Sequence, residues 1–170
     1  MLLSVAGCAP ESSHPLVGEA SGSFACEIFL PGTNPPNSGD GSVTVTLRGE
    51  ERVLAQSAAA FAVDGEGNQT LDPANAIYFA VQIFQYVSET TLEIFEVRVL
   101  PDDWADGAVL AVDGETVVAF FGSVTFDANG NATDATVTAA SNDGELLLDA
   151  AGRNPREPVT GSFAVELSND

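Results

Sequence analysis

The side chains that could perform chemistry in this sequence are almost all carboxylates. Twenty-five Asp and Glu residues accompany one histidine, His14, and two cysteines, Cys8 and Cys26. Nucleophilic triads and histidine-based acid–base catalysis need a histidine at the reaction centre, and His14 lies in a Ser- and Pro-containing stretch near the start. A carboxylate-only hydrolase needs two carboxyl groups about 5 to 9 Å apart across a cleft. The sequence singles out no such pair, and Glu93 and Glu96 are predicted to be solvated strand positions, so we expect a protein that is not an enzyme.

One acidic loop is the better candidate for binding. Asp102, Asp103 and Asp106 surround Trp104, the only tryptophan in the chain. Carboxylate oxygens suit Ca²⁺, and an exposed indole suits the face of a sugar or a protein partner. The alternative is a polar loop whose tryptophan folds back into the core. We favour that alternative, because a sole tryptophan is usually largely buried.

A second acidic segment, Asp127-Ala128-Asn129-Gly130-Asn131, begins like a calcium-binding loop. Position 12 of that loop falls on Thr138, where a bidentate Glu is expected. Because strand patterns flank the segment, it is more typical of a hairpin turn. We therefore expect no cofactor, with calcium as the single alternative.

The beginning of the chain resembles a known sorting signal. Leu3-Ser4-Val5-Ala6-Gly7-Cys8 looks like the end of a bacterial lipoprotein signal, in which small residues precede a cysteine. The resemblance implies that Cys8 is lipidated and becomes the mature N-terminus. It also implies that Ala9 directs the protein to the outer membrane if the cell is Gram-negative. Only seven residues precede Cys8, so either the true start lies upstream of Met1 or the match to the signal is accidental.

This interpretation divides the chain into three parts. Residues 1–7 would be the remnant of a signal peptide, residues 8–21 a flexible tether, and residues 22–170 a single β domain. The protein would then be exported and anchored to the cell envelope by lipid, with a binding or structural role and an unknown protein or saccharide ligand.

The charge balance limits the partners. The formal net charge is −20, and every strong base is an arginine, since the chain contains no lysine. Such a surface repels nucleic-acid phosphates and anionic lipids. We therefore expect no nucleic-acid partner, and membrane contact only through the lipid anchor.

Short apolar runs separated by turn residues predict an all-β fold. Val43, Val45 and Leu47 alternate with polar residues, and so do the apolar residues of the last run, 158–167. About nine or ten such runs indicate an antiparallel β-sandwich (jelly-roll or immunoglobulin-like) or a barrel. Alternation also places Phe24, Cys26 and Ile28 on the core face, so Cys26 is predicted to be a buried, inert thiol.

Three local patterns carry more specific predictions. Asp113-Gly114 predicts a two-residue hairpin between the runs 109–112 and 116–126. A phase shift in the apolar pattern of 91–100 predicts a one-residue bulge. Residues 72–87 favour a strand because β-branched and aromatic residues are dense there. The Asp72-Pro73 pair is a typical helix start, which leaves a helix open in that segment.

Overall fold

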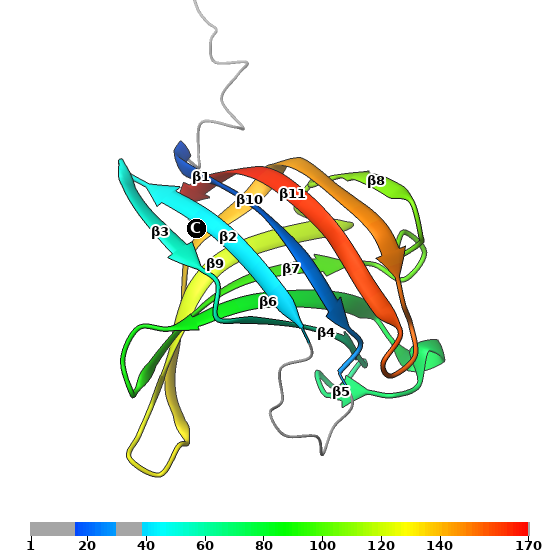
Figure 1. Ribbon diagram of the computed structural model, residues 1–170, viewed down its shortest axis with the longest axis horizontal. Coiled ribbons are helices and arrows are strands. Elements are labelled where there is room, and N and C mark those ends of the chain that lie inside the picture. Colours follow the sequence, from blue (N-terminus) through cyan, green and yellow to red (C-terminus); the bar gives the residue numbers. More distant parts are fainter. Residues whose placement is uncertain (1–15, 30–38, 170) are drawn as a thin grey trace, which may run out of the picture.

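The computed structural model describes residues 16–29 and 39–169, and these residues form an all-β structure (Figure 1). Cys8 and His14 lie outside the described residues. The strands are β1 (Leu16–Glu27), β2 (Asp40–Leu47), β3 (Glu50–Leu54), β4 (Ser57–Val63), β5 (Gln69–Thr70), β6 (Tyr78–Tyr86), β7 (Thr91–Val99), β8 (Ala108–Ala111), β9 (Val117–Phe126), β10 (Ala132–Ala151) and β11 (Pro158–Asn169). The antiparallel all-β prediction is confirmed, with eleven strands instead of nine or ten.

The strands form one antiparallel sheet that coils around its own core without closing. Its order is β3-β2-β1-β11-β10-β9-β7-β6-β4-β5, with β8 paired to β10. Two isolated bridges, Ile28 with Ala60 and Gly39 with Ala58, bring the ends of β1 and β2 against β4. The sheet therefore has two facing halves, as in a sandwich: β1, β2 and β11 on one side, and β4, β6 and β7 on the other (Figure 1).

Aromatic side chains join the two halves across the interior. Phe163 of β11 stacks on Phe95 of β7 with ring centroids 4.8 Å apart, and Phe24 of β1 packs on Phe163 at 6.5 Å. Cys26 and Ile28 point to the same interior, with exposed fractions of 4% and 2%. The predicted inward faces of the first and last long strands are confirmed.

The domain begins earlier than the sequence predicts. β1 starts at Leu16, so residues 16–21, which we expected in the tether, belong to the sheet. Their small residues allow close strand approach: a Cβ at Gly18 would lie 1.7 Å from the carbonyl oxygen of Thr46. A run of small residues that looks like a linker is here a strand packed between two neighbours.

Two predicted local features are wrong. The turn at Asp113-Gly114 does not join paired strands, because β8 pairs with residues 145–148 of β10 and β9 pairs with β7 and β10. β7 also contains no bulge: its register with β6 and β9 is continuous. The phase shift arises because β7 carries apolar residues on both of its faces.

Residues 72–87 contain both a short helical turn and a strand, the two structures considered for this segment. Asp72 caps a short 3-10 helix, Pro73–Asn75, by accepting a hydrogen bond from the Ala74 N–H. The chain then extends into β6, as the density of β-branched and aromatic residues predicts. The helix start signal is correct, and the helix ends after one turn.

Candidate functional site

Trp104 closes one end of the core and is not available to a ligand. Its side chain is 1% exposed, and its ring stacks on Phe79 with centroids 5.0 Å apart. The indole N–H donates to the carbonyl oxygen of Gly152 at 2.8 Å. The hypothesis of a sugar stacking on an exposed indole is therefore wrong, and the alternative of a core tryptophan is confirmed.

The polar groups of the Trp104 loop hold the loop to the segment that follows β10. Arg153 donates from Nη2 to the carbonyl oxygens of Pro101 and Trp104, both at 2.7 Å. Asp106 accepts a hydrogen bond from the Ala151 N–H at 2.7 Å. One carboxylate oxygen of Asp106 and the carbonyl oxygens of Pro101 and Trp104 are thus engaged with protein donors.

No cluster of three or more metal-ligating side chains occurs within residues 16–29 and 39–169. Asp102 and Asp103 are therefore not brought together with Asp106 as a ligand group in the structure described.

The Asp127 segment forms the turn between β9 and β10, as favoured above. Asp127 accepts hydrogen bonds from the N–H groups of Asn129 and Asn131 at 2.8 and 3.0 Å. These bonds lower the pKa of its carboxyl group. The carboxylate shapes its own turn.

Cys26 is buried on the core face, and burial raises the pKa of its thiol to about 12. The thiol is therefore protonated at neutral pH, which is the state of an unreactive structural cysteine.

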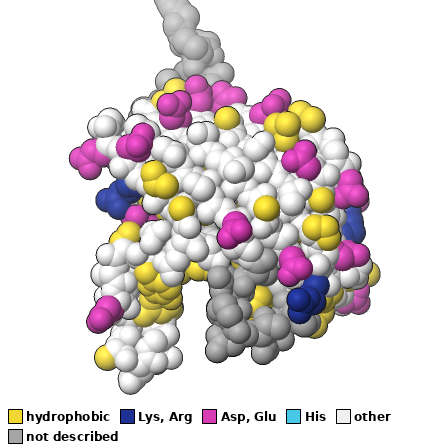
Figure 2. Space-filling view, in the orientation of Figure 1, with side chains coloured by type: hydrophobic (Ala, Val, Ile, Leu, Met, Phe, Trp, Pro, Cys, Tyr) yellow, Lys and Arg dark blue, Asp and Glu magenta, His cyan; other side chains and the backbone are white. Residues whose placement is uncertain are grey.

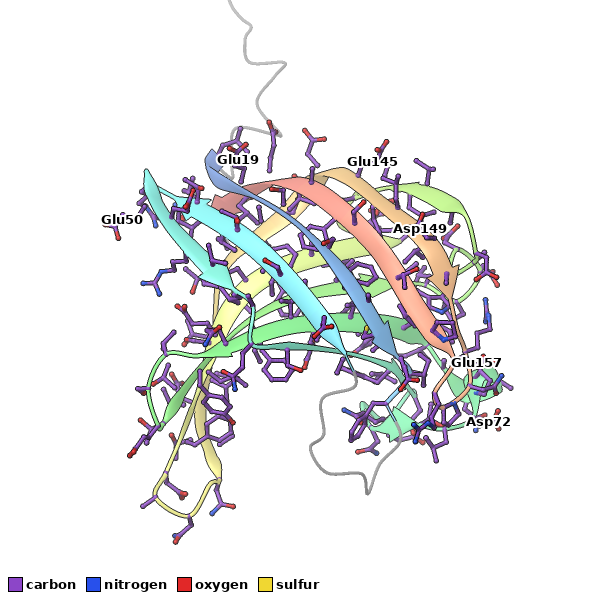
Figure 3. All side chains as sticks on the ribbon, viewed as in Figure 1. Glu19, Glu50, Asp72, Glu145, Asp149 and Glu157 are labelled. Atoms are coloured by element: carbon purple, nitrogen blue, oxygen red, sulfur yellow. The ribbon has the colours of Figure 1, made fainter. Side chains whose placement is uncertain are left out.

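The outer faces of the two halves of the sheet differ sharply in charge. Strands β1, β2, β10 and β11 carry eight carboxylates and no base, and Glu19, Glu145 and Asp149 project outward from them (Figure 3). Strands β4, β6, β7 and β9 carry three charged residues in all: Glu93, Glu96 and Arg98.

Only one ion pair lies on the outer face of β4, β6, β7 and β9, which we call the apolar face. Strand register places on it Phe61, Tyr78, Ala80, Gln82, Phe84, Leu92, Ile94, Glu96, Arg98, Val118, Phe120, Gly122, Val124 and Phe126. The first part of β10 continues this face with Ala135 and Val137, which pair with Val124 and Gly122. Tyr86 and Phe126 pack against each other at its margin, 6.4 Å apart. On a molecule of net charge −20, a largely uncharged surface of this kind is typical of an interaction site.

The ion pair at the centre of the apolar face is unusually well fixed. Glu96 accepts hydrogen bonds from Arg98 Nε and from Gln82 Nε2, the latter at 2.5 Å, and its side chain is 5% exposed. The guanidinium of Arg98 lies 4.8 Å from the ring centroids of both Tyr78 and Phe120. Its side chain remains 40% exposed. The expectation that Glu96 is a solvated strand position is wrong.

A pocket of about 210 Å³ opens beside this ion pair. Its walls come from β6, β7, β9 and the first part of β10, where the β9–β10 hairpin projects from the body of the protein (Figures 1 and 2). Gly122 allows this arrangement, because a Cβ there would lie 2.3 Å from the carbonyl oxygen of Thr136. Ile94, Val124 and Val137 contribute the apolar lining.

Glu93 belongs to a separate region at the open end of the core. It points to the inner face of the sheet and pairs with Arg52 of β3 at 2.5 Å, where β3 faces β7. Because side chains alternate along a strand, Glu93 and Glu96 lie on opposite faces of β7 and cannot flank one substrate bond.

Sequence reasoning missed the apolar face and its ion pair, although a signal was present. The segments that form β4 (Ser57–Val63) and β6 (Tyr78–Tyr86) contain no charged residue. A charge-free strand in so acidic a chain predicts burial or a docking surface.

No protein-family model matches this chain, and no curated protein or solved structure is significantly similar to it. None of the described elements is a helix long and apolar enough to span a membrane.

Proposed function

We propose that this protein is a non-catalytic binding domain, tethered to the cell envelope through lipidated Cys8, and that the apolar face is its binding surface. The observation that carries the proposal is the contrast between the two outer faces. Eight carboxylates lie on β1, β2, β10 and β11, while the outer face of β4, β6, β7 and β9 carries one ion pair. Soluble proteins rarely expose a large contiguous apolar surface without an interaction that uses it.

The lipid anchor and the acidic surface act together in this proposal. The acidic half of the sheet, by which we mean β1, β2, β10 and β11, repels anionic lipid. The anchor therefore holds the domain at the membrane while the charge keeps its body in solution. The net charge of −20 disfavours nucleic acid as a partner. The one carboxylate on the apolar face, Glu96, is engaged by Arg98 and Gln82, which disfavours a catalytic role for it.

A neutral dye tests the binding surface. Nile red, which fluoresces in apolar surroundings, is expected to bind the native protein and to lose most of its signal in Val137→Ser. Val109→Ser is the matched control: Val109 is also an exposed strand valine, 64% exposed against 46% for Val137, but lies on β8. Equal signals from both variants would show that the apolar face is not the binding surface.

The mass of the N-terminal peptide, measured on protein from the host's membrane fraction, tests the anchor. We expect a chain that begins at acylated Cys8. An unmodified chain that begins at Met1 in the soluble fraction would refute the anchor, while leaving the dye experiment to decide on the binding surface.

A further inference from the structure

We infer that the pocket beside Arg98 binds a small amphipathic carboxylate, with the carboxylate on the Arg98 guanidinium and the apolar tail along the β9–β10 hairpin. The inference rests on the proposed function and names the ligand class of the apolar face. It comes from the chemistry that the pocket presents: one exposed cation within an apolar lining.

Arg98 is held in place for a ligand. Tyr78 and Phe120 fix its guanidinium from two aromatic rings, and Glu96 engages Nε. Among the described residues no hydrogen bond reaches the two Nη atoms of Arg98, and the side chain is 40% exposed. A guanidinium with its terminal N–H groups free matches the two oxygens of a carboxylate, and the fixed side chain loses little entropy on binding.

Glu96 has a positioning role. Its carboxylate is nearly inaccessible, so it orients Arg98 through Nε and leaves both Nη atoms without an acceptor among the described residues. Gln82 donates to the other oxygen of Glu96 and keeps that carboxylate satisfied. The exposed polar atoms of the pair are therefore donors, which suit an anion rather than a cation.

The size of the pocket limits the ligand. A volume of about 210 Å³ lies below the roughly 300–1,000 Å³ of most small-molecule sites, so only the head and first part of a tail enter it. Val124 and Val137 continue the apolar surface along the hairpin. A single-charge ligand also suits a molecule of net charge −20 better than an acidic protein partner, whose many charges would be repelled.

Octanoate and octanol, which share one tail, test the inference by isothermal titration calorimetry. The full chain with Cys8→Ser is used, so that no attached acyl group competes, and salt is added to screen the net charge. We expect octanoate to bind at least about tenfold more tightly than octanol, because only octanoate forms charge-assisted hydrogen bonds.

The variants separate the arginine from the apolar surface. Arg98→Gln should abolish the preference for octanoate over octanol. The double variant Glu96→Gln/Arg98→Gln should behave in the same way without leaving a buried unpaired carboxylate. Arg156→Gln, which removes an exposed arginine from the β10–β11 connection, should retain the preference.

Two results would overturn the inference. One is that the parent protein binds octanoate and octanol equally well, or binds neither. The other is that the double variant still prefers octanoate. If either occurs while Val137→Ser still lowers the Nile red signal, the apolar face remains the binding surface and only the ligand class is wrong. If the Nile red contrast is also absent, both proposals fail.

Discussion

At the scale of single residues, several acidic side chains of this protein shape its turns. Asp113 is the strongest case: it accepts hydrogen bonds from the N–H groups of Glu115, Thr116 and Val117 and from the Thr116 hydroxyl. The hydroxyl bond, and then the backbone bonds, hold the pKa of Asp113 far below its usual value. The acids of the loops are thus structural groups as well as sources of net charge.

Replacing Asp113 tests this role through pH. Its lowered folded pKa means that the charged form stabilises the fold above the unfolded pKa of about 4, and that this stability is lost as pH falls toward the folded pKa. Asp113→Ala should lower the free energy of unfolding by about 1 kcal/mol near pH 6, since solvent screens this exposed site, and by less near pH 3.

Urea unfolding followed by circular dichroism measures the effect. Glu115→Gln is the control, because it removes a neighbouring charge from the same turn without removing a hydrogen bond of Asp113. An equal loss for Asp113→Ala at both pH values would contradict the assignment.

At the scale of elements, the two ends of the coiled sheet are held by different groups. The Trp104 loop packs on one end, and the Arg52–Glu93 ion pair joins two strands at the other. Trp104 and Phe79 stack beneath Arg153, whose guanidinium lies 5.2 Å from the Phe79 centroid, and the loop carbonyls cover that arginine. At the opposite end, Arg52 and Glu93 join β3 to β7 where the sheet does not close. These two groups thus connect two strands that are not neighbours in the sheet.

Substitution of Trp104 measures how much the loop contributes. Trp104→Ala should lower the free energy of unfolding by about 3–5 kcal/mol, because it leaves a large cavity and removes the stack on Phe79. Trp104→Phe should lower it by about 1–3 kcal/mol, because the ring can still stack but the Gly152 carbonyl loses its donor.

Chemical unfolding followed by far-ultraviolet circular dichroism distinguishes the two variants without using tryptophan fluorescence. A loss below about 1 kcal/mol for Trp104→Ala would show that the loop does not close the core.

At the scale of the whole molecule, charge is segregated. The acidic half of the sheet and the apolar face point in opposite directions, and only five arginines oppose twenty-five carboxylates. Self-repulsion therefore opposes the compact state at low ionic strength. Binding at the apolar face leaves the acidic half free to interact with solvent and ions.

Salt dependence follows from this distribution. The melting temperature should rise as sodium chloride increases from about 0.01 to about 0.15 M, because the Debye length falls from about 30 to about 8 Å. Calcium and magnesium chlorides, compared at equal ionic strength by differential scanning calorimetry, should raise it equally. A calcium-specific rise that Asp103→Asn and Asp106→Asn abolish would instead establish a calcium site at the Trp104 loop.

The sequence by itself determined the fold class and the core faces of β2 and β11. Where apolar residues alternate strictly with polar ones, only one face of the strand can point into the core. Val43 and Val45 of β2 and Phe163 and Val165 of β11 are examples. It also predicted the Asp127 turn and the buried states of Trp104 and Cys26, because their local composition left few alternatives. The lipidation of Cys8 stays a prediction.

Only the tertiary structure decided which face of β7 and β9 is inside. Both faces of these strands are apolar, and Phe120 and Val124 lie on the outer face of β9. Alternation cannot choose between two apolar faces, and the same ambiguity was misread as a bulge near Glu96. The site around Arg98 combines residues from β6, β7, β9 and β10, so its existence depends on strand pairing that no local pattern encodes.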